Sequence, residues 1–180
     1  LAKNLSSLAD YYVNDAFAVS HRDNVSIAKV AKFLPGYAGF KLESELKSMS
    51  RLLDKPKRPL ILVLGGGKAA DKLRIVKNLK NKVDMVLLGG TPANTILFLK
   101  SFDVKNSLRD KDKKDLSEIR AISNYSNLCL PVDFKWEGNA ILDIGEKTAK
   151  VFQSKIKNAR TIFWNGPMGY LENRSFEKGT

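Results

Sequence analysis

The chain has 180 residues, of which 43% are hydrophobic, and its formal net charge is +12. This hydrophobic content is enough for a buried core and excludes a disordered or fibrous chain. No apolar run approaches the roughly 20 residues that span a bilayer, and the first residues lack the zones of a signal peptide. Because Cys129 is the single cysteine, the chain has no internal disulfide, and we expect a soluble, cytoplasmic protein.

The positive charge attracts anions such as nucleic acids, anionic membranes or phosphorylated metabolites. Basic residues are spread along the chain, and residues 111–121 mix both signs in a helical pattern, which is typical of a solvated surface. The charge alone therefore selects none of these partners. Leu1 is not a start methionine and no closing element precedes Thr180, so we expect an internal fragment of a longer protein.

The first third of the sequence predicts the end of a helix at 2–9, a strand at 11–15 and a loop at 20–24. Apolar residues at spacings of three and four then predict an amphipathic helix at 39–53. A segment rich in proline, 54–59, ends this helix, because proline cannot continue it. That segment is the best candidate for a domain boundary.

The remainder alternates between strand and helix patterns, which predicts an α/β fold with a doubly wound, mainly parallel sheet. Thr91 and Pro92 predict a helix start, because a hydroxyl caps free amides and proline suits the first helical position. Short apolar runs predict strands covered on both faces at 60–64, 83–88, 128–132, 140–144 and 161–164. Helical patterns lie at 71–81, 94–100, 113–125 and 147–156.

Glycine-rich loops follow several of the predicted strands, at 65–68, 89–90, 145 and 165–169. Ligands of parallel sheets bind beyond the carboxyl ends of the strands, where these loops would converge. Glycine permits close approach of the backbone, and the amides of a following helix favour an anion. We therefore expect the loop at 65–68 to contact a phosphate or a nucleoside. Any single glycine is equally typical of a plain turn, so the argument depends on their convergence.

Basic side chains accompany this loop. Lys68 and Lys72 stand four residues apart at the predicted helix start, so both could face one anion, although a solvated surface is the alternative for each. Residues 64–69 match neither a P-loop nor a dinucleotide fingerprint. Arg22 could bind a carboxylate or phosphate and His21 could titrate, although an exposed arginine and a structural histidine are the ordinary interpretations. The residues alone predict a nucleotide-binding α/β protein.

Four segments resemble phosphoglycerate kinase and occur in that family's order: Tyr12–Phe17 with Ser20–Arg22, Leu64–Lys72, Leu130–Asp133 and Trp164–Gly169. The resemblance extends over essentially the whole chain. It implies a Rossmann-like nucleotide-binding domain at 55–180, an interdomain helix at 39–54 and the end of the phosphoglycerate domain at 1–38.

The resemblance also implies a reaction and its residues. In glycolysis, the acyl phosphate of 1,3-bisphosphoglycerate would pass reversibly to ADP bound with Mg²⁺, giving 3-phosphoglycerate and ATP. A cytoplasmic monomer that binds no nucleic acid or membrane is implied. Arg22 would hold phosphoglycerate, while Lys68 and Lys72 would bind the nucleotide phosphates, with Lys72 stabilising the moving phosphoryl group. The other nucleotide contacts would be Gly66, Gly67, Gly90, Asn165, Gly166, Pro167 and, at the ribose, Glu172.

The sequence departs from the family pattern in ways that leave a second hypothesis open. The family's metal-binding aspartate is expected beyond Thr180, and most of the phosphoglycerate pocket before Leu1, so the fragment by itself should be inactive. The passage 133–145 is shorter than in typical members, and Thr91-Pro92 stands where a glycine and a methionine are usual. The alternative is a diverged nucleotide- or polyanion-binding protein without kinase activity.

Overall fold

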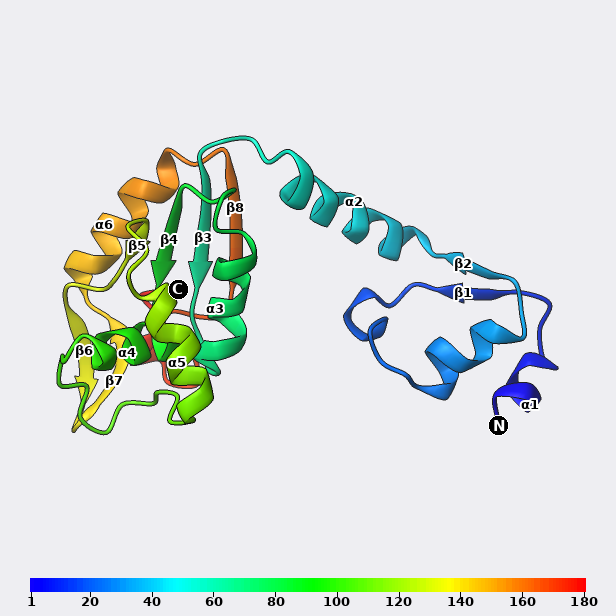
Figure 1. The fold of residues 1–180 in the computed structure, drawn as a ribbon, viewed down its shortest axis with the longest axis horizontal. Coiled ribbons are helices and arrows are strands. Elements are labelled where there is room, and N and C mark those ends of the chain that lie inside the picture. Colours follow the sequence, from blue (N-terminus) through cyan, green and yellow to red (C-terminus); the bar gives the residue numbers. More distant parts are fainter. The chain divides into compact units, whose positions relative to one another are not determined.

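The structure, a computed structural model, describes all 180 residues, and the chain divides into two compact units, Leu1–Lys55 and Pro56–Thr180. Figure 1 shows the elements of each unit. None of the helices is both long enough and apolar enough to cross a lipid bilayer.

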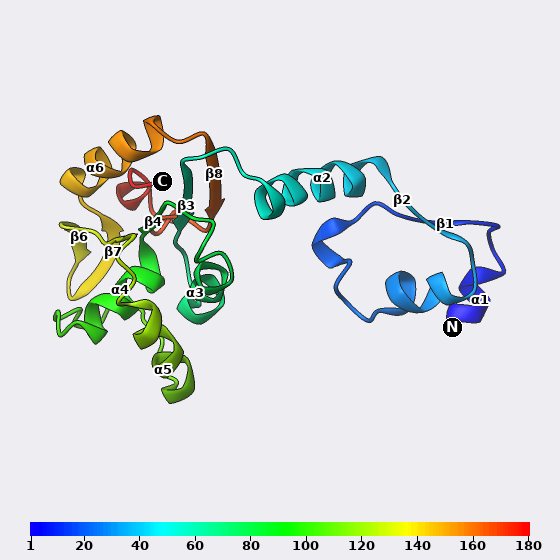
Figure 2. The same ribbon diagram turned by 45° about the horizontal axis from the view of Figure 1, so that its top comes forward.

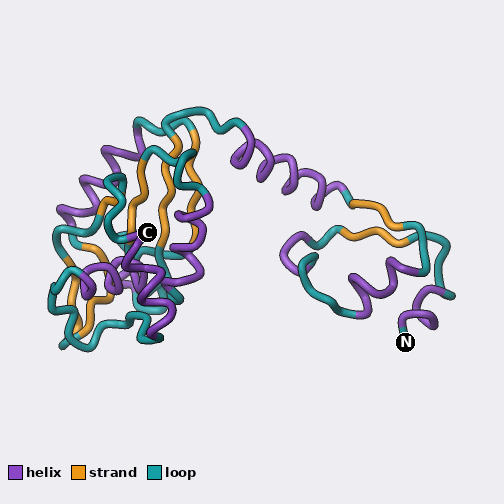
Figure 3. The backbone as a smooth tube through the Cα atoms, viewed as in Figure 1, coloured by secondary structure: helices purple, strands orange, loops and turns teal.

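The first unit contains helix α1 (Ala2–Ser6), strands β1 (Tyr12–Asn14) and β2 (Gly36–Ala38), and helix α2 (Phe40–Asp54). Three short helical turns lie between the strands, at Phe17–Val19, Val25–Lys29 and Val30–Lys32. The predicted strand at 11–15 is confirmed as β1, which pairs in parallel with β2 (Figure 3). The sequence did not predict β2, because Gly36–Ala38 contains no β-branched residue and only one aromatic residue, whereas the stretch at 11–15 carries two tyrosines and a valine.

The second unit is built on a parallel sheet in the order β5-β4-β3-β8, which confirms the predicted doubly wound α/β class. Its strands are β3 (Leu60–Leu64), β4 (Met85–Leu88), β5 (Leu128–Cys129) and β8 (Thr161–Asn165). The helices are α3 (Ala69–Asn78), α4 (Gly90–Leu99), α5 (Lys113–Ile122) and α6 (Glu146–Lys157).

The core of this unit lies on both faces of β3, whose five residues are all buried. Ile61 and Val63 pack in one cluster with Phe152 of α6. Successive strand residues point to opposite faces, so Leu62 faces the side on which Figures 1 and 2 show α3. Strand β8 lies at the sheet edge with exposed residues at alternate positions, so the expectation that it is covered on both faces was wrong.

The prediction that residues 140–144 form a strand was right, but its place in the parallel sheet was wrong. Strand β7 (Ala140–Ile144) pairs antiparallel with β6 (Phe134–Glu137) in a separate hairpin that turns at Gly138, where φ is +55°. A short apolar run does not encode which strand it will join. Here the neighbouring polar residues allow a tight turn, so the chain reverses on itself.

The predicted start of α4 was also wrong. The helix begins at Gly90, with Gly89 as its N-cap, so Thr91 is inside the first turn and 4% exposed. The Thr91 N–H donates to the Gly66 carbonyl oxygen at 2.9 Å. The threonine therefore ties the helix start to the neighbouring glycine loop instead of capping the helix.

Candidate functional site

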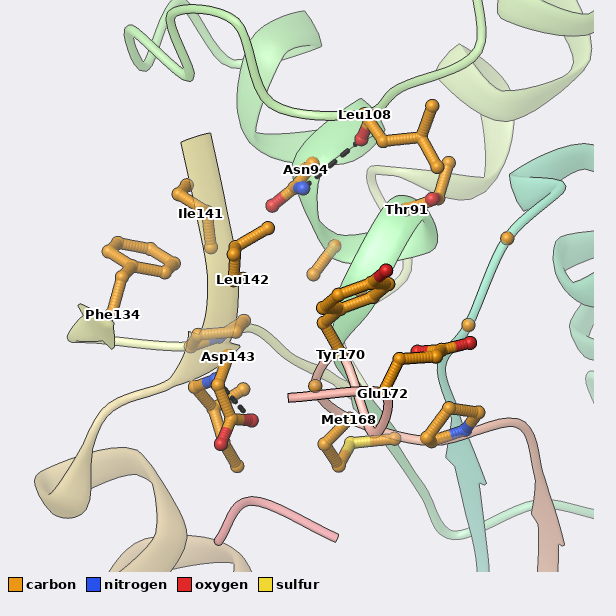
Figure 4. Close-up of a pocket in the computed structure, with 18 residues that line it drawn as sticks. Thr91, Asn94, Leu108, Phe134, Ile141, Leu142, Asp143, Met168, Tyr170 and Glu172 are labelled. Carbon is orange, nitrogen blue, oxygen red and sulfur yellow. Dashed lines mark hydrogen bonds between the residues drawn. The ribbon is translucent and has the colours of Figure 1, made fainter. Parts of the chain in front are cut away.

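A cavity of about 290 Å³ lies in the second unit, between the β6–β7 hairpin, helix α4 and two loops that follow β3 and β8 (Figure 4). Its hairpin side is largely apolar, whereas glycines and the Glu172 carboxylate lie on the loop side. The lining residues are Gly66, Gly67, Gly90, Thr91, Ala93, Asn94, Leu108, Pro131, Phe134, Ile141, Leu142, Asp143, Ile144, Pro167, Met168, Gly169, Tyr170 and Glu172.

The glycine loops after β3, β4 and β8 come together at this cavity. The Gly66 N–H donates to the Pro167 carbonyl at 2.6 Å. A Cβ atom at Gly166 would lie 2.4 Å from the Gly65 oxygen, and one at Gly90 would lie 2.8 Å from the Gly66 nitrogen. Only glycine permits such backbone contact. A Cβ at Gly67, by contrast, would meet nothing within 4 Å, so open space adjoins the loop there.

The loop at Gly145 does not belong to this group. A Cβ at Gly145 would lie 2.2 Å from the Asp133 carboxyl carbon, and this glycine does not line the cavity. Its small size makes room for a carboxylate that caps α6. The expectation that all the glycine loops share one rim was therefore wrong for Gly145.

Lys68 and Lys72 flank the start of α3 but do not line the cavity. Lys68 is the N-cap residue in a left-handed conformation, with φ of +58° and ψ of +76°, so helical spacing does not describe its direction. Lys68 is exposed and Lys72 is half-buried. The Ala70 N–H donates to the Asp110 carboxylate at 2.7 Å, whereas the N–H groups of Gly67 and Lys68 donate to no protein group.

Two buried polar residues of the cavity were not singled out from the sequence. Asp143 is 2% exposed and accepts hydrogen bonds from the N–H groups of Ile144 at 2.8 Å and Gly179 at 2.9 Å. Burial raises the pKa of the Asp143 carboxyl despite these bonds. Asn94 is 3% exposed, and its amide nitrogen donates to the Leu108 carbonyl at 3.1 Å. Both lie within apolar patterns, where their types alone carried no signal.

Five of the predicted nucleotide residues line the cavity: Gly66, Gly67, Gly90, Pro167 and Glu172. Two others support its rim, because the Asn165 carbonyl accepts from the Gly65 N–H at 3.0 Å and Gly166 packs on the same loop. Arg22 and His21 are exposed residues of the first unit. The assigned role of each of these residues stays a prediction.

Comparison with known proteins adds a family to this geometry. A family model described as phosphoglycerate kinase matches residues 1–180. Phosphoglycerate kinase of Finegoldia magna is 40% identical over 201 residues, and that of Dictyoglomus turgidum is 40% identical over 203 residues. Both alignments cover 99% of this chain and 51% of the relative. The alignments, at 201 and 203 residues, are longer than the 180-residue chain, so these relatives carry additional residues within the aligned region.

Solved structures agree with the sequence match. The structure of phosphoglycerate kinase from Coxiella burnetii has a TM-score of 0.82 at 33% identity, covering 99% of this chain and 52% of that one. The enzyme from Pyrococcus horikoshii has a TM-score of 0.86 at 33% identity, with 99% and 51% covered. The chain thus spans about half the length of the relatives it matches. By sequence and by fold, the chain belongs to the phosphoglycerate kinase family.

Proposed function

We propose that this chain carries the nucleotide site of an enzyme that transfers a phosphoryl group reversibly between 1,3-bisphosphoglycerate and ADP, giving 3-phosphoglycerate and ATP. The supporting observation is an apolar cavity that reaches a glycine loop at the start of a helix. Ligand pockets have volumes from about 300 Å³ upward, and this cavity, at about 290 Å³, is at the small end of that range. Its size therefore suits a small ligand such as a nucleoside. Family membership supports the choice of reaction.

The lining suggests how the nucleotide would lie. The apolar end, with Leu108 and Ile141, suits a base, and the Glu172 carboxylate could accept hydrogen bonds from ribose hydroxyls. The phosphates would then extend out of the cavity beside Gly67, where space is open and two backbone N–H groups lack a protein acceptor. Amides at a helix start bind anions in many proteins. The basic residues that follow this loop would be next to the phosphates.

The chemistry needs little beyond position and charge. An ADP oxygen, or in reverse the carboxylate of 3-phosphoglycerate, is already ionised at neutral pH, so no protein base has to activate it. Transfer proceeds through a state whose charge is spread over the equatorial oxygens. Lys72 and Lys68 would stabilise this charge, as donors placed at developing charge do. No covalent intermediate with the protein is required.

Other parts of the proposal rest on the resemblance. Arg22 would contact phosphoglycerate through its planar guanidinium. Magnesium would enter with the nucleotide, because no group of three or more His, Cys, Asp and Glu side chains in this chain is placed to hold a metal ion. A cytoplasmic, monomeric protein belongs to the same proposal.

The test compares two lysines of α3 in the protein expressed from its complete reading frame. We expect Lys72→Ala to lower phosphoglycerate kinase activity with ATP, magnesium and 3-phosphoglycerate by about 100-fold or more, the usual cost of one donor at developing charge. Lys77→Ala removes an equal charge from the last turn of the same helix and should leave activity near the wild-type value.

A folded but inactive wild type would instead favour the diverged binder. Its partner would then be identified by salt dependence, because binding to a nucleic acid falls steeply as salt rises and a nucleotide pocket tolerates salt better. Equal losses in both lysine variants would contradict the role assigned to Lys72.

A further inference from the structure

The glycine loop proposed for the phosphates is fixed at both ends by groups distant in the sequence. At its first end, the Gly66 carbonyl accepts from the Thr91 N–H at 2.9 Å. At its second end, Lys68 is the N-cap residue of α3, but its side chain makes no capping hydrogen bond. The Asp110 carboxylate acts there instead and accepts from the Ala70 N–H at 2.7 Å. The loop is thus held between two fixed points.

Asp110 is itself placed by a buried hydroxyl. Its N–H donates to the Thr95 Oγ1 at 3.1 Å, and the same hydroxyl donates to the Thr91 carbonyl oxygen at 2.8 Å. Thr95 is 0% exposed and Thr91 is 4% exposed. The backbone of Asp110 is therefore tied to the first turn of α4, which also holds Gly66. A connected series of hydrogen bonds joins the start of α4 to the start of α3.

The carboxylate occupies one amide of α3 and leaves others open. The first turn of a helix has N–H groups without an acceptor inside the helix. Asp110 accepts from one of them, at Ala70, whereas the N–H groups of Gly67 and Lys68 donate to no protein group. Lys72 follows Ala70 by two residues, so the placement of this turn sets the point from which the Lys72 ammonium group extends.

Resting on the nucleotide site proposed above, we propose that Asp110 is a positioning residue for phosphoryl transfer, because its carboxylate fixes the first turn of α3 and thereby the place of Lys72. Asp110 does not line the cavity, so it does not contact the base or the ribose. A displacement of about 1 Å at a reacting group can cost about 100-fold in rate. Loss of Asp110 should therefore lower the rate of the chemical step more than the affinity for the nucleotide.

Asp112 offers a matched control only two residues away. It is the N-cap residue of α5, and its side chain accepts from the N–H groups of Lys114 at 2.8 Å and Asp115 at 3.1 Å. Its removal also takes a carboxylate from the first turn of a helix, with a similar loss of stability. Helix α5 carries none of the residues proposed to contact the nucleotide. A purely structural role of Asp110 would therefore make the two variants alike.

The experiment measures kcat, KM for ATP, the dissociation constant of ADP and thermal unfolding in the protein expressed from its complete reading frame. Wild type is compared with Asp110→Ala, Asp110→Asn and Asp112→Ala. We expect Asp110→Ala to lower kcat by about tenfold or more and to weaken ADP binding by a smaller factor. Asp110→Asn keeps an oxygen that can accept from the Ala70 N–H, so kcat should stay near the wild-type value. Asp112→Ala should unfold at a lower temperature with kcat nearly unchanged.

The outcomes separate this assignment from the proposed function. Equal losses of kcat in Asp110→Ala and Asp112→Ala would overturn the positioning role and leave the nucleotide site standing. A low kcat in Asp110→Asn would also overturn it, because this variant keeps the hydrogen bond and loses only the charge. A folded wild type without kinase activity would contradict the proposed function, and the assignment would fall with it. Where Asp110→Ala does not fold, Asp110→Ser takes its place with the same expected loss, since the serine hydroxyl is one bond shorter and does not reach Ala70.

Discussion

Carboxylates distant in sequence cap two of the helices, and each is paired with a glycine. Asp133 accepts hydrogen bonds from the N–H groups of Lys147 at 2.9 Å and Thr148 at 2.7 Å, at the start of α6. Asp15 accepts one from the Leu42 N–H at 2.9 Å, at the start of α2. The N-cap residues themselves are Gly145 and Gly39, which have no side chain to serve as the cap. A Cβ atom at either glycine would collide with the carboxylate.

We expect Asp133→Asn to destabilise the second unit by about 1–2 kcal/mol at pH 7, because an NH2 group replaces one carboxylate oxygen and leaves one N–H of α6 without its acceptor. Burial acts to raise the pKa of the Asp133 carboxyl, but hydrogen bonds from Thr148 and Lys147 outweigh it and hold the pKa below its ordinary value. Since the folded-state pKa is lowered, this stabilisation is present above the unfolded pKa of about 3.9 and is lost as pH falls through the folded pKa.

Urea unfolding at a series of pH values checks this expectation. The difference in the free energy of unfolding between wild type and Asp133→Asn should be largest at pH 6–7 and should become smaller below about pH 4. Glu177→Ala serves as the control, because this exposed side chain accepts no hydrogen bond. A gap that stays constant at all pH values would show that the carboxylate charge is not what stabilises α6.

The glycine contacts at the cavity rim should be sensitive to a single methyl group. Gly166→Ala would place Cβ 2.4 Å from the Gly65 oxygen at a φ of +82°, so the loops after β3 and β8 would have to separate. Gly138→Ala has a comparable φ of +55° but no atom within 4 Å. We expect Gly138→Ala to cost about 1 kcal/mol and Gly166→Ala at least twice that. Thermal unfolding of the two variants measures the loss of stability in each. Equal losses would show that the contact with the Gly65 oxygen does not add to the cost of Gly166→Ala.

At the scale of elements, the β6–β7 hairpin forms one wall of the cavity and is held by the segment that follows α4. The Ile141 N–H donates to the buried Ser107 hydroxyl oxygen at 2.8 Å, and the Asn106 N–H donates to the Asn139 carbonyl at 2.9 Å. The Phe134 ring lies 5.3 Å from the Phe102 ring, centroid to centroid. Since isolated hairpins are marginally stable, these contacts position the wall.

Ser107→Ala should therefore loosen the hairpin selectively. The substitution leaves the half-buried Ile141 N–H without an acceptor, at a cost of about 1–3 kcal/mol. We expect faster amide hydrogen exchange in residues 134–144 and weaker binding of ADP. Ser154→Ala removes a hydroxyl from an exposed position of α6 and should change neither the exchange rates nor the affinity for ADP. Unchanged exchange in the hairpin would mean that the aromatic contacts hold it without Ser107.

The sequence predicted the alternation of strands and helices because burial imposes continuous apolar runs such as residues 60–64. It did not predict that β7 leaves the parallel sheet, because strand pairing depends on contacts between distant segments. The caps supplied by Asp133 and Asp15 lie 14 and 27 residues from their partners, beyond any local capping rule. Glycine spacing did indicate the cavity rim, since the glycines are required by backbone contact there. Asn94 gave no signal, because its meaning comes from the cavity around it.

At the scale of the whole molecule, the two units differ in how much core they hold. Of 27 buried hydrophobic residues, three lie in Leu1–Lys55 and the other 24 lie in Pro56–Thr180. The three are Val30, Leu42 and Leu52. Large exposed apolar side chains in this unit include Tyr11, Phe33, Tyr37 and Phe40. Hydrophobic burial is the main favourable term in folding, so the stability of the chain must reside in the second unit.

We therefore expect residues 56–180, produced alone, to unfold cooperatively at a temperature within a few degrees of the corresponding transition in the 180-residue chain. Residues 1–55 alone should lack a cooperative transition, because three buried hydrophobic side chains in a unit of this size do not form a core. Circular dichroism during thermal unfolding measures both. ADP binding should be retained by residues 56–180, since every residue that lines the cavity lies there. A cooperative transition in residues 1–55 produced alone would contradict this distribution of stability. So would a fragment 56–180 that does not fold.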